Sequence, residues 1–353
     1  MARSKVAALR VTPQTVLEDI QRGTDLAELS GALARGCTTL IRSTTPHLPA
    51  PGVGTTPWQL DGAIRALRHN GYDDLVCVQD QIYSDDPGGQ LALCRQLCTP
   101  VRSFCDQLDT LRVAYRPKAR LQILHQLFPG GLHIPDSYFG KNVVHLPTLR
   151  PHPHAAVAGA AHSALSGLLG SRGHLAPGSW QHGLVDALAI QREVHSGLFT
   201  IMDGTSVSNA TRSEPKRPPL LKNIVLASAD PVAIDAVAIK LMGIDPLDVP
   251  YIKLAQDSGL GTGDPRDIEL VGDDISTERW AFHLAPPVSN PLRRALGHGR
   301  QLLLRSPLAD VVETSKRFVH DRYRWPRHER KVFETWKQQT DWGRLFAAYE
   351  AGR

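Results

Sequence analysis

The sequence contains no hydrophobic run approaching the ~20 residues needed to cross a bilayer, although 42% of its 353 residues are hydrophobic. We therefore do not expect a membrane-spanning protein. The N-terminal stretch MARSKVAALRV lacks the apolar segment and the small-residue cleavage site of a secretory signal. The lack of both features predicts a soluble, cytoplasmic chain.

Cysteine is also scarce, and the five thiols are Cys37, Cys77, Cys94, Cys98 and Cys105. An odd number without a secretory signal disfavours a disulfide framework and predicts reduced thiols. Cys94, Cys98 and Cys105 have a spacing that can place three sulfur atoms on one helix face, as a metal or cluster would require. That spacing matches no standard cluster motif, so buried structural cysteines are the preferred interpretation.

The net charge of +5 is concentrated near the C-terminus, because residues 291–353 contain fourteen Lys or Arg against seven Asp or Glu. After a proline-rich linker, 275–353 is predicted to form a basic, aromatic-rich helical extension. Its aromatic residues include Trp325, Phe333, Trp336, Trp342, Phe346 and Tyr349. We expect these to pack onto the main body rather than to stack on nucleic-acid bases, since no recognised nucleic-acid motif accompanies them. A homodimer or another protein partner could also assemble through this extension.

Residues 1–274 alternate short apolar runs with amphipathic stretches, which is typical of strands and helices in a layered α/β domain. Strands are expected near 6–11, 38–41, 75–78, 111–114, 142–146, 198–202 and 224–227. Helices are expected after 12 and across 58–70, 84–108, 155–169 and 231–242. The prediction is a mostly parallel, twisted, Rossmann-like sheet with helices on both faces. It forms one domain or two lobes, near 1–140 and 141–274.

Several segments of this core carry recognisable motifs. FTIMDGTSVSN places Asp-Gly at the end of an apolar strand, and LKNIVLASADPVAIDAVAIKLMGIDP contains an Ala-Ser-x-Asp-Pro-Val-Ala-x-Asp-Ala run. Upstream, TTLIRSTTPHLPAPGVGTTPWQLDGAIRALRHNGYDDLVCVQD is a strand, loop, helix and strand, and NVVHLPTLRPHPHAAVAGAAHSALSGLLG is a strand, a turn and a helix. Over roughly residues 1–275 these segments resemble the domain of unknown function 362 family. The resemblance implies an α/β fold and a pocket more than a defined reaction.

The sequence also departs from that family's pattern. A lysine-proline-asparagine loop is replaced by Arg42-Ser43-Thr44, and a helical lysine-asparagine pair is replaced by Ser166-Gly167. The ferredoxin-like cluster domain of many members is missing, because the chain has no C-x-x-C-x-x-C run. The resemblance therefore carries no cluster-based redox role to this chain.

Binding sites in open α/β sheets form at the carboxyl ends of strands, where loops and helix N-termini meet. Four segments are expected to converge there: the loop 42–56, the turn 150–154, the loop after Asp203 and the turn 228–230. The predicted catalytic residues are Asp203, Asp235, His152 and His154. The predicted substrate-binding residues are Arg42, Thr44, Thr55, Arg150, Ser228 and Asp230.

Each candidate has a structural alternative. Asp230 precedes a proline, where an acid most often caps a helix, and Asp203 precedes glycine, where it can form a turn. Asp235 lies in an otherwise apolar helix, so it needs either a basic partner or a function. If the turn is extended, His152 and His154 point to opposite sides, and only one of them is expected to face the pocket.

Seven histidines lie between 145 and 195: His145, His152, His154, His162, His174, His182 and His195. Imidazole titrates near neutral pH and ligates metals, so this concentration favours acid–base or metal chemistry. Arg42 and Arg150 suit bidentate contact with a carboxylate or phosphate. We therefore expect an enzyme of small-molecule, including specialised, metabolism that acts on an anionic substrate.

Asp and His acid–base chemistry fits an isomerase, lyase or transferase better than cluster-based redox. No organic cofactor motif is recognisable, and the cofactor is left unknown. A metal ion stays open, with His152 and His154 as its candidate ligands. The alternatives are an accessory protein that binds or transfers a metal or cluster, and a metal-dependent enzyme.

Overall fold

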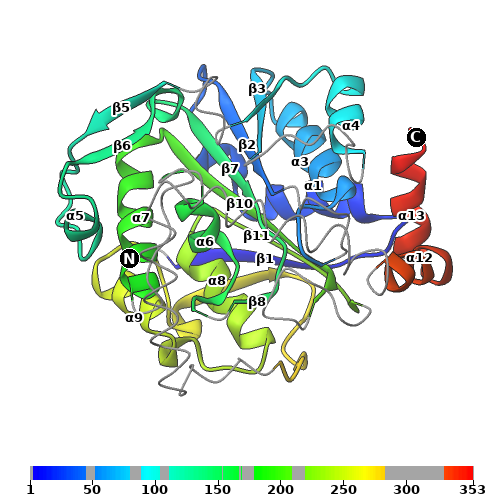
Figure 1. Ribbon diagram of the computed structural model, residues 1–353. Helices are drawn as coiled ribbons and strands as arrows, with labels where there is room; N and C mark the ends of the chain where they lie inside the picture. The colour runs from blue at the N-terminus through cyan, green and yellow to red at the C-terminus, as the bar shows by residue number, and fades with distance from the viewer. Residues whose placement is uncertain are drawn as a thin grey trace.

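In the computed structural model, the described residues are 3–44, 52–79, 89–103, 111–152, 154–166, 168, 179–208, 219–282 and 330–352. A sheet of eight strands, in the order β12-β1-β11-β10-β7-β2-β3-β4, runs through the molecule (Figure 1). The strands are β1 (Ser4–Arg10), β2 (Thr39–Ser43), β3 (Leu75–Gln79), β4 (Val101–Ser103), β7 (Asn142–Leu146), β10 (Gly197–Val207), β11 (Leu220–Ser228) and β12 (Ile268–Gly272). None of the helices in the described ranges combines the length and hydropathy needed to span a membrane.

Seven of these strands run in one direction. Each neighbouring pair from β10 through β7, β2 and β3 to β4 is parallel, and β1 is parallel to β12. Strand β11 is antiparallel to both of its neighbours, β1 and β10. The expected mostly parallel sheet is therefore confirmed with one reversal, and the segment after β11 leaves the sheet at the amino ends of the other strands.

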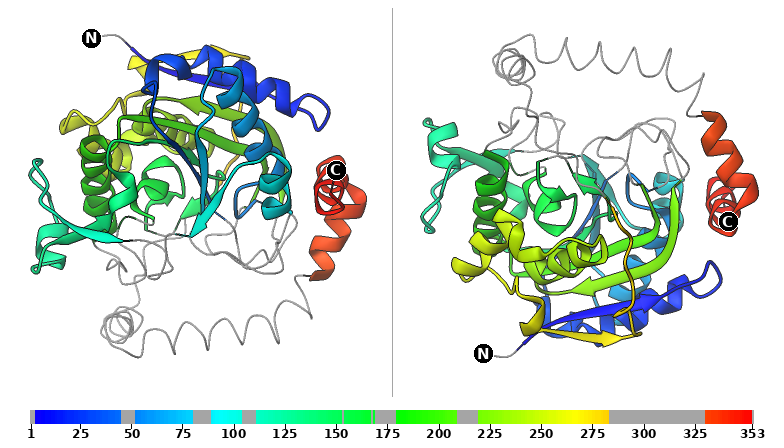
Figure 2. Two further views of the ribbon diagram at one scale, coloured as in Figure 1. Left: turned by 90° about the horizontal axis from the view of Figure 1, so that it is seen from above. Right: turned by 90° about the horizontal axis from the view of Figure 1, so that it is seen from below.

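Successive side chains of each strand point to opposite faces of the sheet, so an apolar core forms on each face. Val143 and Met202 pack with helices α6 to α9, whereas their chain neighbours Val144 and Ile201 pack with α1 and α3. These helices are α1 (Val16–Leu26), α3 (Pro57–His69), α6 (Ala160–Leu165), α7 (Trp180–Val194), α8 (Pro231–Leu241) and α9 (Pro250–Asp257). Helices on both faces, as predicted from the sequence, are confirmed (Figure 2).

Apart from two helices near the C-terminus, the remaining described elements are short. The helices are α2 (Leu29–Ala32), α4 (Gln90–Gln96), α5 (Leu124–Leu127) and the single turns η1 (Asp136–Tyr138), η3 (Pro246–Asp248) and η4 (Pro265–Asp267). Two small antiparallel sheets pair β5 (Arg112–Tyr115) with β6 (Leu132–Pro135) and β8 (Pro151–His152) with β9 (Ala156–Val157).

Two expected helices are shorter than the sequence indicated. The helix expected over 155–169 begins only at Ala160, because Ala156 adopts a left-handed backbone conformation, with φ of 66°, inside the β8–β9 hairpin. In the described part of 84–108, the helix is α4 alone, and Val101–Ser103 forms the edge strand β4 instead.

A helical hairpin near the C-terminus, α12 (Arg330–Gln339) and α13 (Asp341–Glu350), docks beside α3. The ring of Trp342 packs at a tilt against Trp58 of α3, with 4.9 Å between the ring centroids, and its indole N–H donates to Asn223 Oδ1 at 2.8 Å. The Tyr349 hydroxyl donates to Asp61 Oδ2 at 2.8 Å. The expectation that the aromatic residues pack onto the main body is met by the buried residues Phe333, Trp336, Trp342, Phe346 and Tyr349. Trp325 lies outside the described residues.

Replacing Trp342 with alanine should lower the free energy of unfolding by about 3–5 kcal/mol, because truncating a buried aromatic side chain removes apolar contact and leaves a cavity. Urea denaturation measures this change. Arg344→Ala, an exposed neighbour on the same helix, is the control and should change the same quantity by less than about 0.5 kcal/mol. Equal losses in the two variants would contradict the docked hairpin.

Candidate functional site

The predicted site residues do not all lie at one edge of the sheet. Because β11 is antiparallel, Ser228 and Asp230 lie beside the start of β1: Ser228 Oγ donates to the Lys5 carbonyl at 2.6 Å, and Ser4 Oγ donates to Asp230 Oδ2 at 2.6 Å. The other strands begin at this edge. The expectation that the turn 228–230 converges with the loops near 42, 150 and 203 is therefore wrong.

Asp230 caps helix α8. Its Oδ1 atom accepts hydrogen bonds from the backbone N–H groups of Val232, at 2.8 Å, and Ala233, at 3.1 Å. Pro231 occupies the first helical turn, where a missing N–H costs nothing. The capping alternative considered for Asp230 is the arrangement that the structure shows.

Asp203 is fully buried on the face of the sheet that α3 covers. Its carboxylate accepts from the Thr56 hydroxyl, and its Oδ1 atom accepts from the Thr205 N–H at 2.7 Å. Burial raises the pKa of this carboxyl, against the lowering effect of the Thr56 hydrogen bond. Thr55 and Thr44 tie the same loop together, since Thr55 Oγ donates to the Leu146 carbonyl at 2.7 Å and accepts from the Thr44 N–H at 2.8 Å. These contacts anchor the start of α3.

Arg42 points to the opposite face of the sheet from Asp203. It lies opposite His145 in the β2–β7 register, and the His145 Nε2 atom is 3.0 Å from Gln191 Oε1 on α7. The Arg42 side chain is buried, and its Nε donates weakly, at 3.4 Å, to the Ser163 carbonyl of α6. Arg42 and Asp203 therefore cannot act on one substrate atom through the sheet that separates them.

The structure does bring Arg150, His152 and His154 into one neighbourhood, together with His162 and Trp180. The ring centroids of His152 and His162 lie 4.9 Å apart. Each of the three imidazoles lies close to the Trp180 indole, with centroid distances of 4.8 Å for His152, 6.3 Å for His154 and 5.6 Å for His162. We call these five residues the Trp180 cluster. Both histidines of the 150–154 turn belong to it.

The protonation of His152 follows from its contacts. Its Nδ1 atom accepts from the N–H groups of Ala155, at 3.0 Å, and His154, at 3.3 Å, so its proton is on Nε2. Burial, together with the nearby His162 and Arg150, lowers the pKa of His152 to about 2. His152 is therefore a neutral hydrogen-bond donor across the physiological pH range.

Arg150 carries the charge of the cluster. Burial lowers the pKa of its guanidinium, and no carboxylate of the described chain forms an ion pair or hydrogen bond with it. The next α-helix, α6, brings His162 to the same place. The result is one cation, three imidazoles and one indole at a single location after β7.

Asp235 holds helix α6 in position. Its two carboxylate oxygens accept from the N–H groups of Ala160, at 2.7 Å, and Ala161, at 3.0 Å, and the Tyr251 hydroxyl donates to Oδ2 at 3.0 Å. A Cβ atom at Gly159 would lie 2.0 Å from Asp235 Oδ1, so only glycine permits this approach. The partners of Asp235 are thus helix N–H groups and a phenol rather than the basic residue considered as its alternative.

Within the described ranges, no three residues of His, Cys, Asp or Glu are grouped so that they could hold a metal ion. The His152 Nδ1 atom is already occupied by backbone N–H groups. His152 and His154 therefore do not form a metal centre with other described residues.

Two members of the cluster were not among the predicted site residues. In the sequence, His162 stands out only as part of a histidine-rich stretch. Its spacing from His152 does not indicate that the two imidazoles lie together. No sequence pattern indicates that Trp180 belongs to the site, because it lies far along the chain from the 150–154 turn. The helix α7 that carries Trp180 brings it back beside α6.

The fold and this geometry define an α/β protein with a histidine-rich cluster beside one edge of a mostly parallel sheet. Residues 118–240 match the family described as domain of unknown function (DUF362), which confirms the resemblance expected from the sequence. The matched range contains the whole Trp180 cluster as well as Asp203 and Asp235. No curated protein matches the chain.

A crystal structure of a Thermotoga maritima protein, solved as a structural genomics target, is similar at 10% sequence identity with a TM-score of 0.39. The similarity covers 70% of this chain and 60% of that protein. This chain therefore spans less than two thirds of the length of that relative.

Ionisation of the Asp235 carboxyl should make the free energy of unfolding depend on pH. Burial raises the pKa of its carboxyl to about 7 from an ordinary value of 3.8, so the folded protein retains a proton that the unfolded chain releases. This contribution is present below about pH 4 and is lost as the pH rises through about 7. Relative to Asp235→Asn, which cannot ionise, wild type should lose about 2 kcal/mol of unfolding free energy between about pH 5 and pH 7.

Urea denaturation of both proteins at several pH values measures this difference. Wild type and Asp235→Asn share all other titrating groups, so the contributions of those groups cancel in the difference between their unfolding free energies. A difference that stays constant with pH would show that Asp235 is ionised throughout the range.

Proposed function

We propose that this chain is an enzyme that binds an anionic small molecule, bearing a carboxylate or phosphate, at the Trp180 cluster and transfers a proton through its histidines. The main support is Arg150, a partly buried guanidinium for which the described residues supply no carboxylate partner. Withdrawing a cation from water without a partner is costly. A bound oxyanion would remove that cost.

The three imidazoles take different roles in this proposal. His152 offers an Nε2–H donor to the substrate, because its Nδ1 lone pair is engaged by the backbone. His154 and His162 are then the proton carriers, since imidazole is the side chain best matched to proton transfer near neutral pH. Trp180 supplies an apolar wall for the uncharged part of the substrate.

Asp203 and Asp235 are assigned supporting roles here. Asp203 fixes the start of α3, and Asp235 fixes the start of α6, which carries His162. Gln181 links the cluster to α9, because its side chain donates to the His154 carbonyl and accepts from the Tyr251 N–H. A proton-transfer site held by buried groups of this kind suits an isomerase, lyase or transferase.

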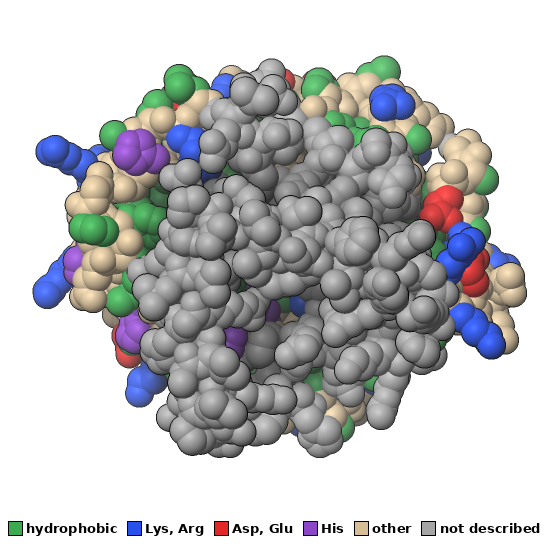
Figure 3. Space-filling view, viewed as in Figure 1, with side chains coloured by type: hydrophobic (Ala, Val, Ile, Leu, Met, Phe, Trp, Pro, Cys, Tyr) green, Lys and Arg blue, Asp and Glu red, His purple; other side chains and the backbone are tan. Residues whose placement is uncertain are grey.

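A small anion is favoured over a nucleic acid. Among the described residues, the Lys and Arg side chains visible in Figure 3 lie singly or in small groups along the edge of the face shown there. Phosphate-backbone binding depends on clustered cations. We further propose that the protein acts in the cytoplasm, which the free thiols of Cys37, Cys77, Cys94 and Cys98 support.

The test is to incubate a metabolite extract from a bacterial culture with purified wild type, Arg150→Gln or His154→Ala and to compare the mixtures by mass spectrometry. We expect wild type to deplete at least one carboxylate- or phosphate-bearing compound. Both variants should slow that depletion by about 100-fold or more, since Arg150 holds the anion and His154 moves the proton.

Arg120→Gln is the matched control, because it removes an exposed arginine from a neighbouring segment. It should leave the depletion rate unchanged. The proposal fails if no anionic compound changes with wild type, or if the two cluster variants act as fast as the control.

A further inference from the structure

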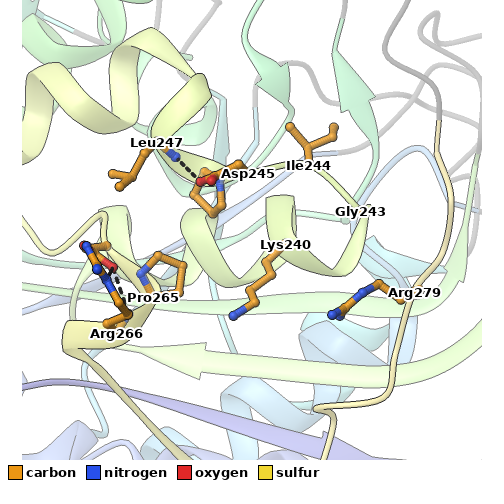
Figure 4. Close-up of a pocket in the computed structure, with 10 residues that line it drawn as sticks. Lys240, Gly243, Ile244, Asp245, Leu247, Pro265, Arg266 and Arg279 are labelled. Atoms are coloured by element: carbon orange, nitrogen blue, oxygen red, sulfur yellow. Dashed lines mark hydrogen bonds and ion pairs between the residues drawn. The ribbon is translucent and has the colours of Figure 1, made fainter.

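A surface cleft of about 520 Å³ lies away from the Trp180 cluster, at the end of α8. Figure 4 shows three segments around it: the last turn of α8 with the loop that follows, η4, and the extended loop that carries Arg279. None of the ten residues predicted from the sequence as catalytic or substrate-binding lines this cleft. Its volume lies within the range of about 300–1,000 Å³ that small-molecule sites occupy.

The charges in the cleft do not cancel. Arg266 is satisfied by Asp264, since its guanidinium donates to both carboxylate oxygens at distances from 2.6 to 3.1 Å. Asp245 Oδ1 accepts from the Leu247 N–H at 3.0 Å and is engaged as a cap of η3. With three cations and two carboxylates in the lining, one positive charge is in excess, and Lys240 and Arg279 are the cations outside the Arg266–Asp264 ion pair.

Neither Lys240 nor Arg279 forms a direct ion pair with a described carboxylate, although Asp264 attracts Lys240 over a longer distance. Lys240 forms no ion pair or hydrogen bond within the described chain, and Arg279 donates only to the carbonyl of its neighbour Glu278, at 3.1 Å. Figure 4 shows both side chains extending from different segments along the same side of the cleft. They are placed to hold an anion between them.

The loop after α8 lines the cleft with the apolar residues Ile244, Pro246 and Leu247 and with Asp245, and η4 adds Pro265. Gly243 starts this loop with φ of +89°, a conformation that favours glycine, and so turns the chain away from the helix end. Lys240 and Arg279 together with the apolar residues of this lining suit a ligand that has an anionic group and an apolar part.

We propose that this cleft is a second binding site, for a small organic anion that carries a phosphate or carboxylate on an apolar body. The oxyanion lies between Lys240 and Arg279, and the apolar body packs against the Ile244–Leu247 loop. This site is independent of the function proposed for the Trp180 cluster. It fits an effector or a second substrate.

Phenyl phosphate is the probe, and the amide signal of Gly243 in a ¹⁵N-labelled sample reports the location. We expect a saturable shift of that signal in wild type. The double variant Lys240→Ala, Arg279→Ala should weaken binding roughly tenfold, as expected for two exposed charge contacts. Benzyl alcohol, which has the ring without the charge, should cause no saturable shift.

Two controls make the result specific. Lys253→Ala removes an exposed lysine of α9 outside the cleft and should bind phenyl phosphate as wild type does. Arg150→Gln should also leave the Gly243 shift unchanged, which separates this site from the Trp180 cluster. Benzoate distinguishes the two oxyanions, since tighter binding of phenyl phosphate identifies a phosphate site and the reverse identifies a carboxylate site.

The proposal is overturned if the Gly243 signal does not move, if Lys253→Ala weakens binding as much as the double variant, or if benzyl alcohol binds as well as phenyl phosphate. Because Lys240, Lys253 and Arg279 are exposed, the variants at these positions are expected to fold. Their unfolding midpoints confirm this.

Discussion

The bond between the Asp235 carboxylate and the first N–H groups of α6 is the contact on which the local architecture depends. Helix α6 has only six residues, far below the ~12–15 at which an isolated helix becomes even marginally stable in water. Its N–H groups are buried, and an unpaired buried N–H is costly. By accepting two of them from inside a neighbouring helix, Asp235 fixes both where α6 starts and where His162 lies. The Tyr251 hydroxyl in turn holds the carboxylate, so α8, α9 and α6 form one supported unit beneath the histidines.

The reversed direction of β11 is the second constraint. It decides which polar residues lie at the amino ends of the parallel strands and which lie at their carboxyl ends. In a fully parallel sheet, the Asp230 turn would stand beside the ends of β2 and β7. The antiparallel pairing of β11 with both neighbours moves that turn to the far edge, where its polar groups become a cap for α8 and a link to the start of β1. Motifs that are adjacent in a family pattern can thus serve separate ends of the molecule. The chemistry that remains near the end of β7 is carried by histidine and arginine rather than by aspartate.

Local features of this fold could be read from the sequence, and relations between distant segments could not. The Asp230 cap lies next to Pro231, so a few residues sufficed to indicate it. The strands were visible as apolar runs, but an interior strand is apolar on both faces whether it is parallel or antiparallel, so the direction of β11 left no trace. The same limit applies to Asp203, whose partner Thr56 is 147 residues away. Trp180 and His162 joined the histidine turn only through the packing of α6 on α7, which no spacing encodes.

The docked C-terminal hairpin has a consequence for how the chain is made. Tyr349 bonds to Asp61 across 288 residues of sequence, and Trp342 covers Trp58 on the same helix. Ribosomes deliver the N-terminal portion first, so α3 emerges long before the aromatic residues that cover it. During synthesis, an indole and a buried acid stay uncovered on the nascent chain. Docking of the hairpin must therefore follow synthesis of residues 330–350, and until then the aromatic surface of α3 is open to chaperones.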